Sequence, residues 1–205
     1  SRGPLHTLLV GREMFGKNIL RNINKINPAI PGTPVKIFKI KEIPSGGRST
    51  WLAVATSSGV YVVNNWKQCD VGDPNGLNFF PQNLNTVNPT IGHACYTIVS
   101  KTNDTNNAIY FVGTDIGVFK SSNRCFDWAK TAKFNNQTLS VSDLKYFTDT
   151  NGNGYLLAAT NIGVWISDND GDNWQTIQSY TDTNIQIANT PVFGISLNKA
   201  PREVF

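Results

Sequence analysis

Few residues of this chain are of types that do chemistry, and the acids among them lie in turns and connections. Asp115 lies in a short turn between two apolar stretches, whereas Asp70, Asp73 and Asp182 lie in longer polar segments. Glycoside hydrolysis needs two carboxylates about 5–10 Å apart across the scissile bond, so one of these three acids paired with Asp115 would suit it. The simpler interpretation of Asp115 is a carboxylate that accepts hydrogen bonds within its own turn.

Other catalytic chemistry has less support in the sequence. The two histidines, His6 and His93, are isolated, which argues against His-based triads and most zinc sites. Cys69, Cys95 and Cys125 are too few and too irregularly spaced for a disulfide framework. One bridge with one free thiol and three buried thiols both stay open. No glycine-rich phosphate loop occurs. We therefore predict no catalytic residues and no metal site.

One turn has part of the spacing of a calcium loop. Asp149, Asn151 and Asn153 alternate ahead of Gly154, as in the first half of an EF-hand loop. The position that must hold a bidentate glutamate is Thr160, so we favour a plain polar hairpin turn. We expect no cofactor, with calcium at Asp149, Asn151 and Asn153 as the alternative.

Three aligned segments position these turns. Residues 51–63, 109–121 and 155–167 read WLAVATSSGVYVV, IYFVGTDIGVFKS and YLLAATNIGVWIS. Each is an apolar strand, a threonine, two further residues, a glycine and a second strand. The glycines lie 58 and 46 residues apart, and periods of about 40–50 residues made of strand and turn signals are typical of β-propeller blades. Since no helical periodicity of useful length occurs, we predict an all-β fold.

A polar turn ending in tryptophan follows the second and third copies. The better copy consists of Ser167, Asn169, Gly171 and Trp174. The weaker copy consists of Ser121, Asn123, Cys125 and Trp128. A short acceptor can hold such a turn, a glycine can take positive φ, and the tryptophan can fold back as an apolar plug between neighbouring sheets. The remaining acids of the better copy are interpreted as solvated turn residues: Asp168, Asp170 and Asp172.

These turns resemble the Asp-box, the bacterial-neuraminidase (BNR) repeat S-x-D-x-G-x-T-W, with Asn169 at the Asp position and Asn173 at the Thr position. The resemblance covers about residues 35–205. It implies a β-propeller of sialidase-, sortilin- or xyloglucanase-like architecture with four-stranded antiparallel blades. The chain holds about four and a half such repeats, and a closed ring usually has about six to eight blades. We therefore expect an incomplete ring that is part of a larger protein.

The predicted organisation has six parts. They are a partial preceding blade and linker (1–34), blade 1 (35–66), a long inter-blade loop (67–92), blade 2 (93–140), blade 3 (141–190) and the start of a further blade (191–205). The long loop carries Phe79 and Phe80, whose simpler role is to anchor it, with ligand contact as the alternative.

Alternating strand direction divides the turns between two faces of the predicted ring. If the strands of a blade are lettered A to D, the A–B and C–D turns share one face and the B–C and D–A connections share the other. In the resembling families the Asp-box, a C–D turn, is structural, and ligands bind near the axis on the B–C face. The candidate ligand-binding residues are therefore Ser58, Asp115, Asn161, Phe79 and Phe80.

Composition restricts the function classes further. The net charge is +4, and the lysines and arginines are scattered, with Lys36, Lys39 and Lys41 as the nearest approach to a basic stripe. We therefore predict no nucleic-acid partner. No apolar run approaches the roughly 18 residues of a membrane span. A chain rich in Asn, Thr, Ser and Gly suits an extracellular, cell-envelope or virion-surface protein.

We accordingly predict a non-catalytic module that serves as a scaffold or as a glycan- or protein-binding face. Its partners would be the rest of the parent protein or another subunit that completes the ring, together with a glycan or protein ligand. The alternative is part of a propeller glycoside hydrolase or lyase whose catalytic acids lie partly outside this chain. No arginine cluster or Arg-Ile-Pro stretch of the sialidase type is present, which argues against a sialidase active site.

Overall fold

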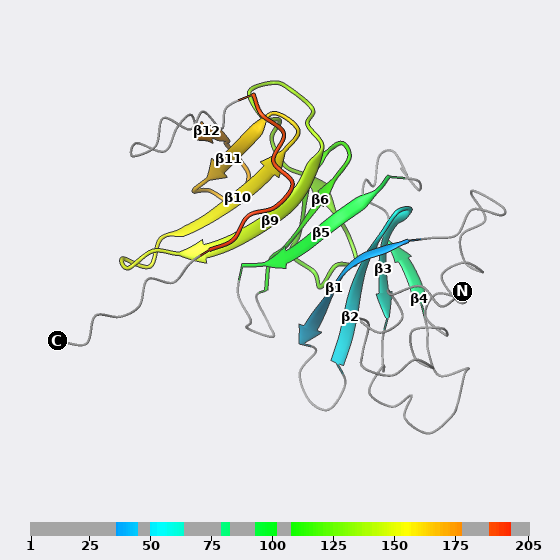
Figure 1. Cartoon of the computed structure of the whole chain (residues 1–205). Helices are drawn as coiled ribbons and strands as arrows, with labels where there is room; N and C mark the ends of the chain where they lie inside the picture. Colours follow the sequence, from blue (N-terminus) through cyan, green and yellow to red (C-terminus); the bar gives the residue numbers. More distant parts are fainter. Residues whose placement is uncertain are drawn as a thin grey trace.

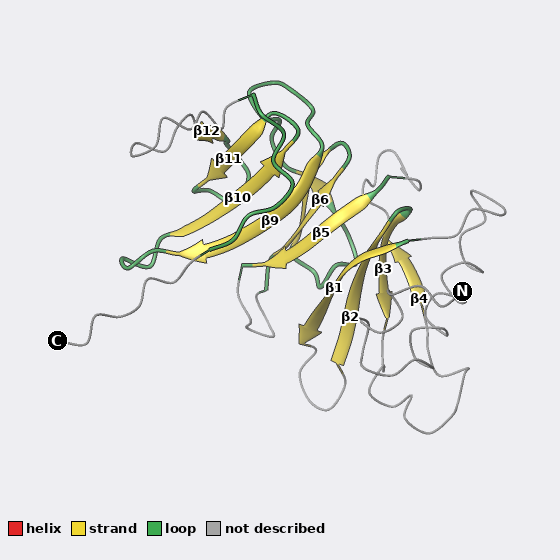
Figure 2. Cartoon of the chain, in the orientation of Figure 1, coloured by secondary structure: helices red, strands yellow, loops and turns green. Residues whose placement is uncertain are grey.

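The structure, a computed structural model, describes residues 36–44, 50–63, 79–82, 93–101, 108–177 and 189–197. The regular structure in these residues is β-strand, arranged in three four-stranded antiparallel sheets (Figure 1, Figure 2). The predicted all-β class is therefore confirmed. In this part of the chain no helix has the length and apolarity needed to cross a membrane.

Each sheet consists of four strands that are consecutive in the chain and neighbours in space. The first sheet contains β1 (Ile37–Pro44), β2 (Thr50–Thr56), β3 (Gly59–Val63) and β4 (Phe79–Gln82). The second sheet contains β5 (Cys95–Ser100), β6 (Tyr110–Thr114), β7 (Gly117–Ser121) and β8 (Ala129–Lys130). The third sheet contains β9 (Val141–Thr148), β10 (Gly154–Thr160), β11 (Gly163–Ser167) and β12 (Gln175–Ile177).

The second sheet is buried on both faces, which explains why its strands are continuous apolar runs. In β6, Tyr110 and Val112 pack in an apolar cluster shared with the first sheet, whereas Phe111 packs in a cluster shared with the third. Val118 and Phe119 of β7 divide between the two clusters in the same way. Burial of each large side chain contributes about 1.5–3 kcal/mol before the entropic cost of ordering it. The three sheets are thus packed against one another in chain order.

The first strands of the sheets lie together, and the tryptophans of the polar turns fill the spaces between sheets. Strand β5 contacts both β1 and β9 (Figure 1). Trp128 belongs to the cluster between the first and second sheets, and Trp174 to the cluster between the second and third. Each tryptophan follows the turn that joins the third and fourth strands of its sheet, so that turn delivers a large apolar side chain to the neighbouring sheet.

Strand β4 corrects the interpretation of residues 67–92 as an irregular loop. Phe79 and Phe80 lie in a fourth strand of the first sheet, paired with Val63 and Val62. The strand is short, and its Pro81 is tolerated because β4 is the edge of the sheet, where one backbone N–H needs no ladder partner. Surrounding Asn, Pro and Gly residues mask this strand in the sequence. The first sheet therefore extends beyond the predicted boundary at residue 66.

Residues 189–197 lie alongside the third sheet without forming the predicted further strand. The N–H of Val192 donates to the carbonyl of Thr160 at 2.9 Å, and Ser142 Oγ donates to the carbonyl of Val192 at 2.7 Å. The N–H of Ile195 donates to the carboxylate of Asp143 at 3.1 Å. Side chains of β9 and one backbone carbonyl of β10 therefore hold this segment.

Candidate functional site

The hairpin between the second and third strands has the same internal hydrogen bonds in every sheet. A threonine hydroxyl donates to the carbonyl of the glycine three residues on, at 2.8–2.9 Å. The same hydroxyl accepts the N–H two positions on, at 3.1–3.2 Å. The glycine φ angles are 115–123°, a conformation that favours glycine. The residues are Thr56, Thr114, Thr160, Gly59, Gly117 and Gly163.

The residue after each threonine ties this hairpin to the start of the first strand. The N–H of Ser57 donates to the carbonyl of Lys36 at 2.8 Å, and that of Asn161 to the carbonyl of Ser140 at 3.2 Å. In return, Ser57 Oγ and Asn161 Oδ1 accept the N–H groups of the same partners at 2.9 and 3.1 Å. Asn161, a predicted ligand-binding residue, therefore has its amide oxygen engaged within the fold.

Asp115 occupies the same position in the second sheet but uses its side chain differently. Its N–H donates to the carbonyl of Ala94 at 3.1 Å, as in the other sheets. Its carboxylate lies 2.8 Å from Nδ1 of His93, and the two side chains are 37% and 25% exposed. The interpretation of His93 as an isolated histidine is wrong, because the hairpin brings this acid to it from 22 residues away.

The second sheet also brings Lys130 close enough for its charge to interact with that of Asp115. The ammonium of Lys130 lies 5.7 Å from the centroid of the Phe119 ring. Partial burial lowers the pKa of Lys130, the charge of Lys133 lowers it further, and Asp115 acts in the opposite direction. The carboxylate of Asp115 is therefore accompanied by the imidazole of His93 and by the charge of Lys130.

This group of side chains is suited to orienting and binding a ligand. An imidazole held by a carboxylate presents its other nitrogen in a defined direction. Hydrolysis by two carboxylates would need a second acid close to Asp115. Asp70, Asp73 and Asp182, which the sequence offers for that role, lie outside the described residues.

Among the remaining predicted ligand-binding residues, Ser58 has a described side chain, whereas Phe79 and Phe80 do not. Ser58 is buried, with 6% of its surface exposed, and its side chain is hydrogen-bonded to Tyr61. Burial raises the pKa of Tyr61, and the hydrogen bond from Ser58 acts against that rise. Phe79 and Phe80 belong to the edge strand β4, and their side chains lie outside the described part of the structure.

The cysteines contribute packing. Cys95 and Cys125 are free and buried, and both belong to the apolar cluster between the first and second sheets. Burial raises the pKa of both thiols well above the ordinary value, which keeps them protonated and unreactive. Cys69 lies outside the described residues. A bridge between Cys95 and Cys125 is thereby excluded from the alternatives that the sequence leaves open.

The calcium-like turn uses its acceptors internally. Asp149 Oδ1 accepts the N–H groups of Asn151 and Asn153 at 2.9 and 2.8 Å, and Oδ2 accepts Asn153 Nδ2 at 3.0 Å. Hydrogen bonds lower the pKa of Asp149 below its usual value. The largest contribution comes from the Asn153 amide group, and smaller ones come from the backbone N–H groups of Asn153 and Asn151 and from the Tyr155 hydroxyl. Across the described residues no group of three or more His, Cys, Asp or Glu side chains gathers. The calcium site stays a prediction, and the turn already satisfies its carboxylate.

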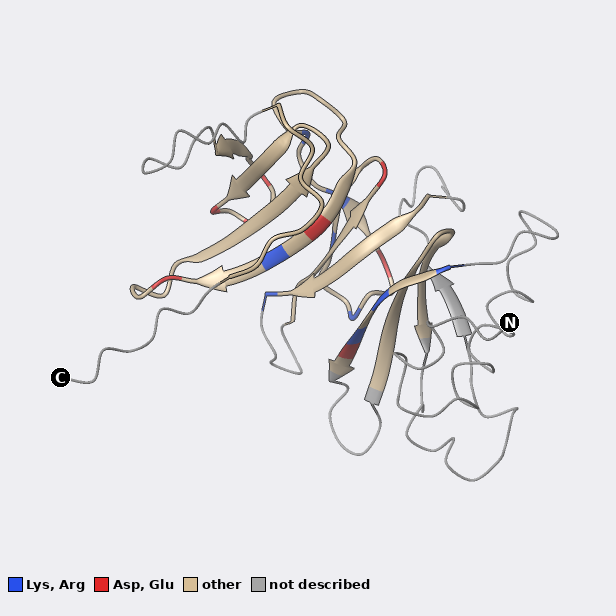
Figure 3. Cartoon of the chain, in the orientation of Figure 1, with Lys and Arg blue, Asp and Glu red and all other residues tan. Residues whose placement is uncertain are grey.

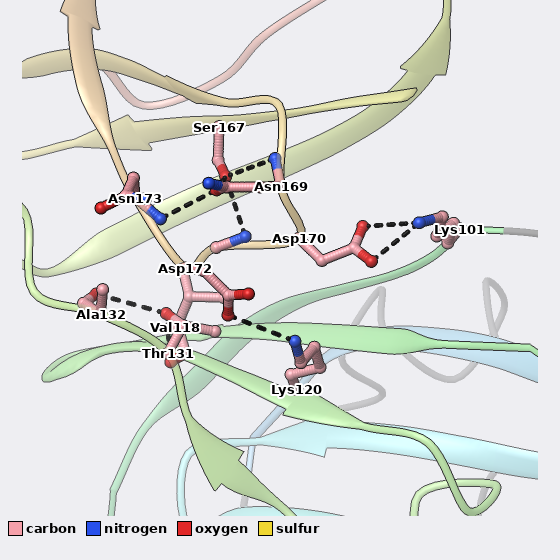
Figure 4. A network of polar contacts seen from close by, with 11 residues as sticks. Lys101, Val118, Lys120, Thr131, Ala132, Ser167, Asn169, Asp170, Asp172 and Asn173 are labelled. Carbon is pink, nitrogen blue, oxygen red and sulfur yellow. Dashed lines mark hydrogen bonds and ion pairs between the residues drawn. The ribbon is translucent and has the colours of Figure 1, made fainter. Parts of the chain in front are cut away.

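The turn between β11 and β12 of the third sheet is joined to the second sheet by two ion pairs (Figure 4). Lys101 Nζ lies 2.9 and 2.7 Å from the two carboxylate oxygens of Asp170. Lys120 Nζ lies 3.5 Å from Asp172. The interpretation of Asp170 as a solvated acid is therefore corrected, because its side chain is 22% exposed and pairs with a lysine that follows β5. Asp172 is 68% exposed and Asp168 is exposed, so both are solvated as predicted.

Comparison with solved structures gives five chains with a similar fold, and two of them illustrate the likeness. Both are structures of the extracellular domain of BT4673 from B. thetaiotaomicron, described as a one-component system in one and as a hybrid two-component system in the other. Their TM-scores are 0.52 and 0.51, and their sequence identities are 19% and 20%. Each match covers 80% of this chain and 19% of the solved chain, so the chain spans about a fifth of those proteins. The likeness shows a shared all-β fold. No family model and no curated protein matches the sequence.

Proposed function

We propose that this chain is a non-catalytic β-propeller module of an extracellular protein, and that it serves as a scaffold whose B–C face binds a glycan or protein ligand. Its three sheets are then consecutive blades related to the Asp-box family. The observation that carries this proposal is the repetition of one unit. A Thr-x-x-Gly hairpin joins the second and third strands of every sheet, and in the second and third sheets a tryptophan after the next turn packs between that sheet and its neighbour.

Two further facts support the proposal. The first strands lie together, as the inner strands of propeller blades do. The structural neighbours are extracellular domains of a protein described as a one- or two-component system, which agrees with an extracellular module of a larger protein. The rest of the parent protein, or another subunit, would complete the ring.

The non-catalytic part of the proposal depends on the Asp115–His93 pair. A glycosidase would oppose Asp115 with a second acid, whereas Asp115 is paired with an imidazole. The test is to incubate the protein with a panel of polysaccharides and to follow new reducing ends by mass spectrometry. We expect no turnover. Turnover that the Asp115→Asn variant abolishes would instead support the glycoside hydrolase or lyase alternative.

The propeller arrangement has a separate test. A crystal structure of the chain within a longer protein should show the packing of one sheet on the next repeated about a single axis until a ring closes. The inner strands β1, β5 and β9 should then line that axis. A stack that continues as an open superhelix, or three hairpins merged into one continuous sheet, would contradict the proposal.

A further inference from the structure

A β-bulge occurs at the same place in the first strand of every sheet. The register shifts by one residue directly after the first residue of β1, β5 and β9. The unpaired residues are Phe38, Tyr96 and Ser142. A bulge interrupts the ladder and turns its extra side chain in a new direction, and such bulges occur often beside functional sites. These three positions lie at the hairpin end of strands that are themselves neighbours.

At two of these positions the side chain is aromatic and accessible. The rings of Phe38 and Tyr96 lie 5.3 Å apart at an interplanar angle of 57°, so they form one surface across the first and second sheets. Phe38 is 42% exposed, although neighbouring apolar residues of the same strands, Ile37 and Ile98, are almost completely buried. A single exposed aromatic residue would need no explanation, but equivalent bulges in adjacent sheets are a repeated feature.

A third exposed aromatic residue, Phe193, lies in the segment that is hydrogen-bonded to the bulge residue of the third sheet, Ser142. The sequence Val192-Phe193-Gly194-Ile195 matches Ile37-Phe38-Lys39-Ile40 in its apolar, aromatic, variable, apolar order. Its backbone is fixed against β9 and the end of β10 by the hydrogen bonds of Val192 and Ile195, yet the Phe193 side chain is 82% exposed. The fold therefore holds this backbone in place while leaving the ring uncovered.

Positive charge accompanies the aromatic surface. Lys36 and Lys39, on either side of Phe38, are both exposed. Figure 3 shows the lysines of β1 beside the uncharged strand β5. The Asp115–His93 pair adjoins the same end of the second sheet, because Asp115 is bonded to Ala94, two residues before Tyr96. Apolar ring faces, cations and an oriented hydrogen-bonding pair are thus brought to the hairpin end of these first strands.

We propose that Phe38, Tyr96 and Phe193 form a stacking surface for an oligosaccharide that carries carboxylate groups, with Lys36 and Lys39 as its counter-charges. A pyranose ring has an apolar C–H face, which packs on the electron-rich face of an aromatic ring, and polar edges, which hydrogen-bond. Uronate carboxylates would lie toward the exposed ammonium groups. This inference rests on the proposed binding function and names its ligand class and its residues.

The test measures binding by isothermal titration calorimetry, with trimers of galacturonate, glucuronate and mannuronate as probes and maltotriose as the neutral reference. We expect at least one uronate trimer to bind. Phe38→Ala and Tyr96→Ala should each weaken that binding more than tenfold, and Phe38→Trp should restore it because it keeps a ring face. Lys39→Gln should weaken binding severalfold and reduce its salt dependence.

Matched controls separate this surface from general effects. Phe126, in the Asp-box turn of the second sheet, is also exposed, at 38%, and Phe126→Ala should leave binding unchanged. Lys120→Gln removes one positive charge that faces Asp172 and lies outside the proposed surface, so it should also leave binding unchanged. Thermal unfolding of every variant should show a folded protein, so that a loss of affinity reports on the ligand.

Each other outcome counts against the inference. It is overturned if no uronate trimer binds the wild type, if maltotriose binds equally well, or if a single-stranded oligonucleotide binds in place of the sugars. If a uronate trimer binds but the Phe38 and Tyr96 variants keep full affinity, this surface is wrong while the proposed binding function stands. If the wild type cleaves the trimers, the non-catalytic function is wrong.

Discussion

The second and third sheets close with turns of the same geometry that are built from different residues. In both, a serine hydroxyl accepts the N–H four residues on, at 3.0 Å in the second sheet and 2.8 Å in the third. In both, an asparagine Oδ1 accepts the N–H four residues on, at 2.9 and 2.8 Å. The serines and asparagines are Ser121, Asn123, Ser167 and Asn169. The shared geometry therefore follows from the shared pair of acceptors.

The difference lies at the position of the glycine. Gly171 has φ of 88°, and Cys125 at the equivalent place has φ of 65°. A Cβ on Gly171 would lie 2.8 Å from Cγ2 of Thr131 in the second sheet, whereas Cys125 is fully buried in the apolar cluster between the first and second sheets. The turn itself therefore tolerates a side chain in the left-handed region, and the approach of the neighbouring sheet is what requires glycine.

The largest loss of stability is expected when either tryptophan side chain between two sheets is removed. Trp128→Ala and Trp174→Ala should each destabilise the fold by about 3–5 kcal/mol, because each empties a large volume between two sheets. Trp128→Ala should destabilise the fold at least as much as Trp174→Ala, because Trp128 is 2% exposed and Trp174 is 8% exposed. Urea denaturation followed by circular dichroism measures both. A loss below about 1 kcal/mol, as expected for an exposed residue, would show that the turns do not wedge the sheets.

Gly171→Ala should be the next most damaging change. The left-handed backbone costs a non-glycine residue about 1–2 kcal/mol, and forcing a methyl group against Thr131 adds about 1–3 kcal/mol of overpacking. The double variant with Thr131→Ala removes the contact at 2.8 Å and should recover part of the loss. If the double variant is no more stable than Gly171→Ala in the same denaturation experiment, backbone strain alone explains the requirement for glycine.

Removing the serine acceptor tests what the two turns share. Ser167→Ala and Ser121→Ala should each cost about 1–3 kcal/mol, since a backbone N–H inside the turn loses its partner. The serines are 2% and 1% exposed, so water does not readily replace the hydroxyl. We expect similar losses at the two positions. A loss at one turn only would mean that the other is held by its tryptophan and not by its hydrogen bonds.

The sequence predicts the repeated part of this molecule well because each repeat is local. The Thr-x-x-Gly hairpins and the polar turns are closed by contacts between residues two to four positions apart, and such contacts are visible in residue order. Strand β4 is missed because its pairing with β3 crosses a long connection rich in turn residues. Its aromatic pair Phe79-Phe80 is the one strand signal there, and an edge position permits the proline that hides it.

The candidate site is less predictable because it is assembled across longer separations. Asp115 is recognisable as a turn acid, but its partner His93 is 22 residues away. A partial signal exists: in the other sheets the partner of this turn residue lies directly before the first strand, as Lys36 and Ser140 do. The equivalent residue of the second sheet is Ala94, and His93 precedes it by one position. The pairing of Lys101 with Asp170, 69 residues apart, has no such local signal, since it depends on how two sheets pack.

Two substitutions of Cys125 test whether the turn of the second sheet stores backbone strain, because such strain would make the glycine variant more stable than the alanine variant. Cys125→Ala keeps the left-handed strain and loses the buried sulfur, whereas Cys125→Gly loses the sulfur but relieves the strain. The glycine variant should therefore be the more stable of the two by about 1 kcal/mol, opposite to the preference of most buried positions. Thermal unfolding of both variants, monitored by tryptophan fluorescence, measures the order. An alanine variant that is the more stable would show that the turn stores no backbone strain at Cys125.

The smallest effect expected is specific to the third sheet, whose turn carries Asp170 facing Lys101. The hydrogen bond from Lys101 to Asp170 raises the pKa of the lysine, against the opposing influence of its partial burial. A raised pKa in the folded state means that the ion pair stabilises the protein fully below the ordinary lysine pKa of about 10.4, and that this contribution disappears as pH rises through the folded value. Since the Lys101 side chain is 37% exposed, Lys101→Gln should cost less than about 1 kcal/mol at neutral pH. Urea denaturation of the wild type and of Lys101→Gln between pH 7 and 11 measures the difference in their free energies of unfolding. This difference should shrink at the alkaline end. A difference that stays constant would assign the loss to packing of the lysine stem instead of its charge.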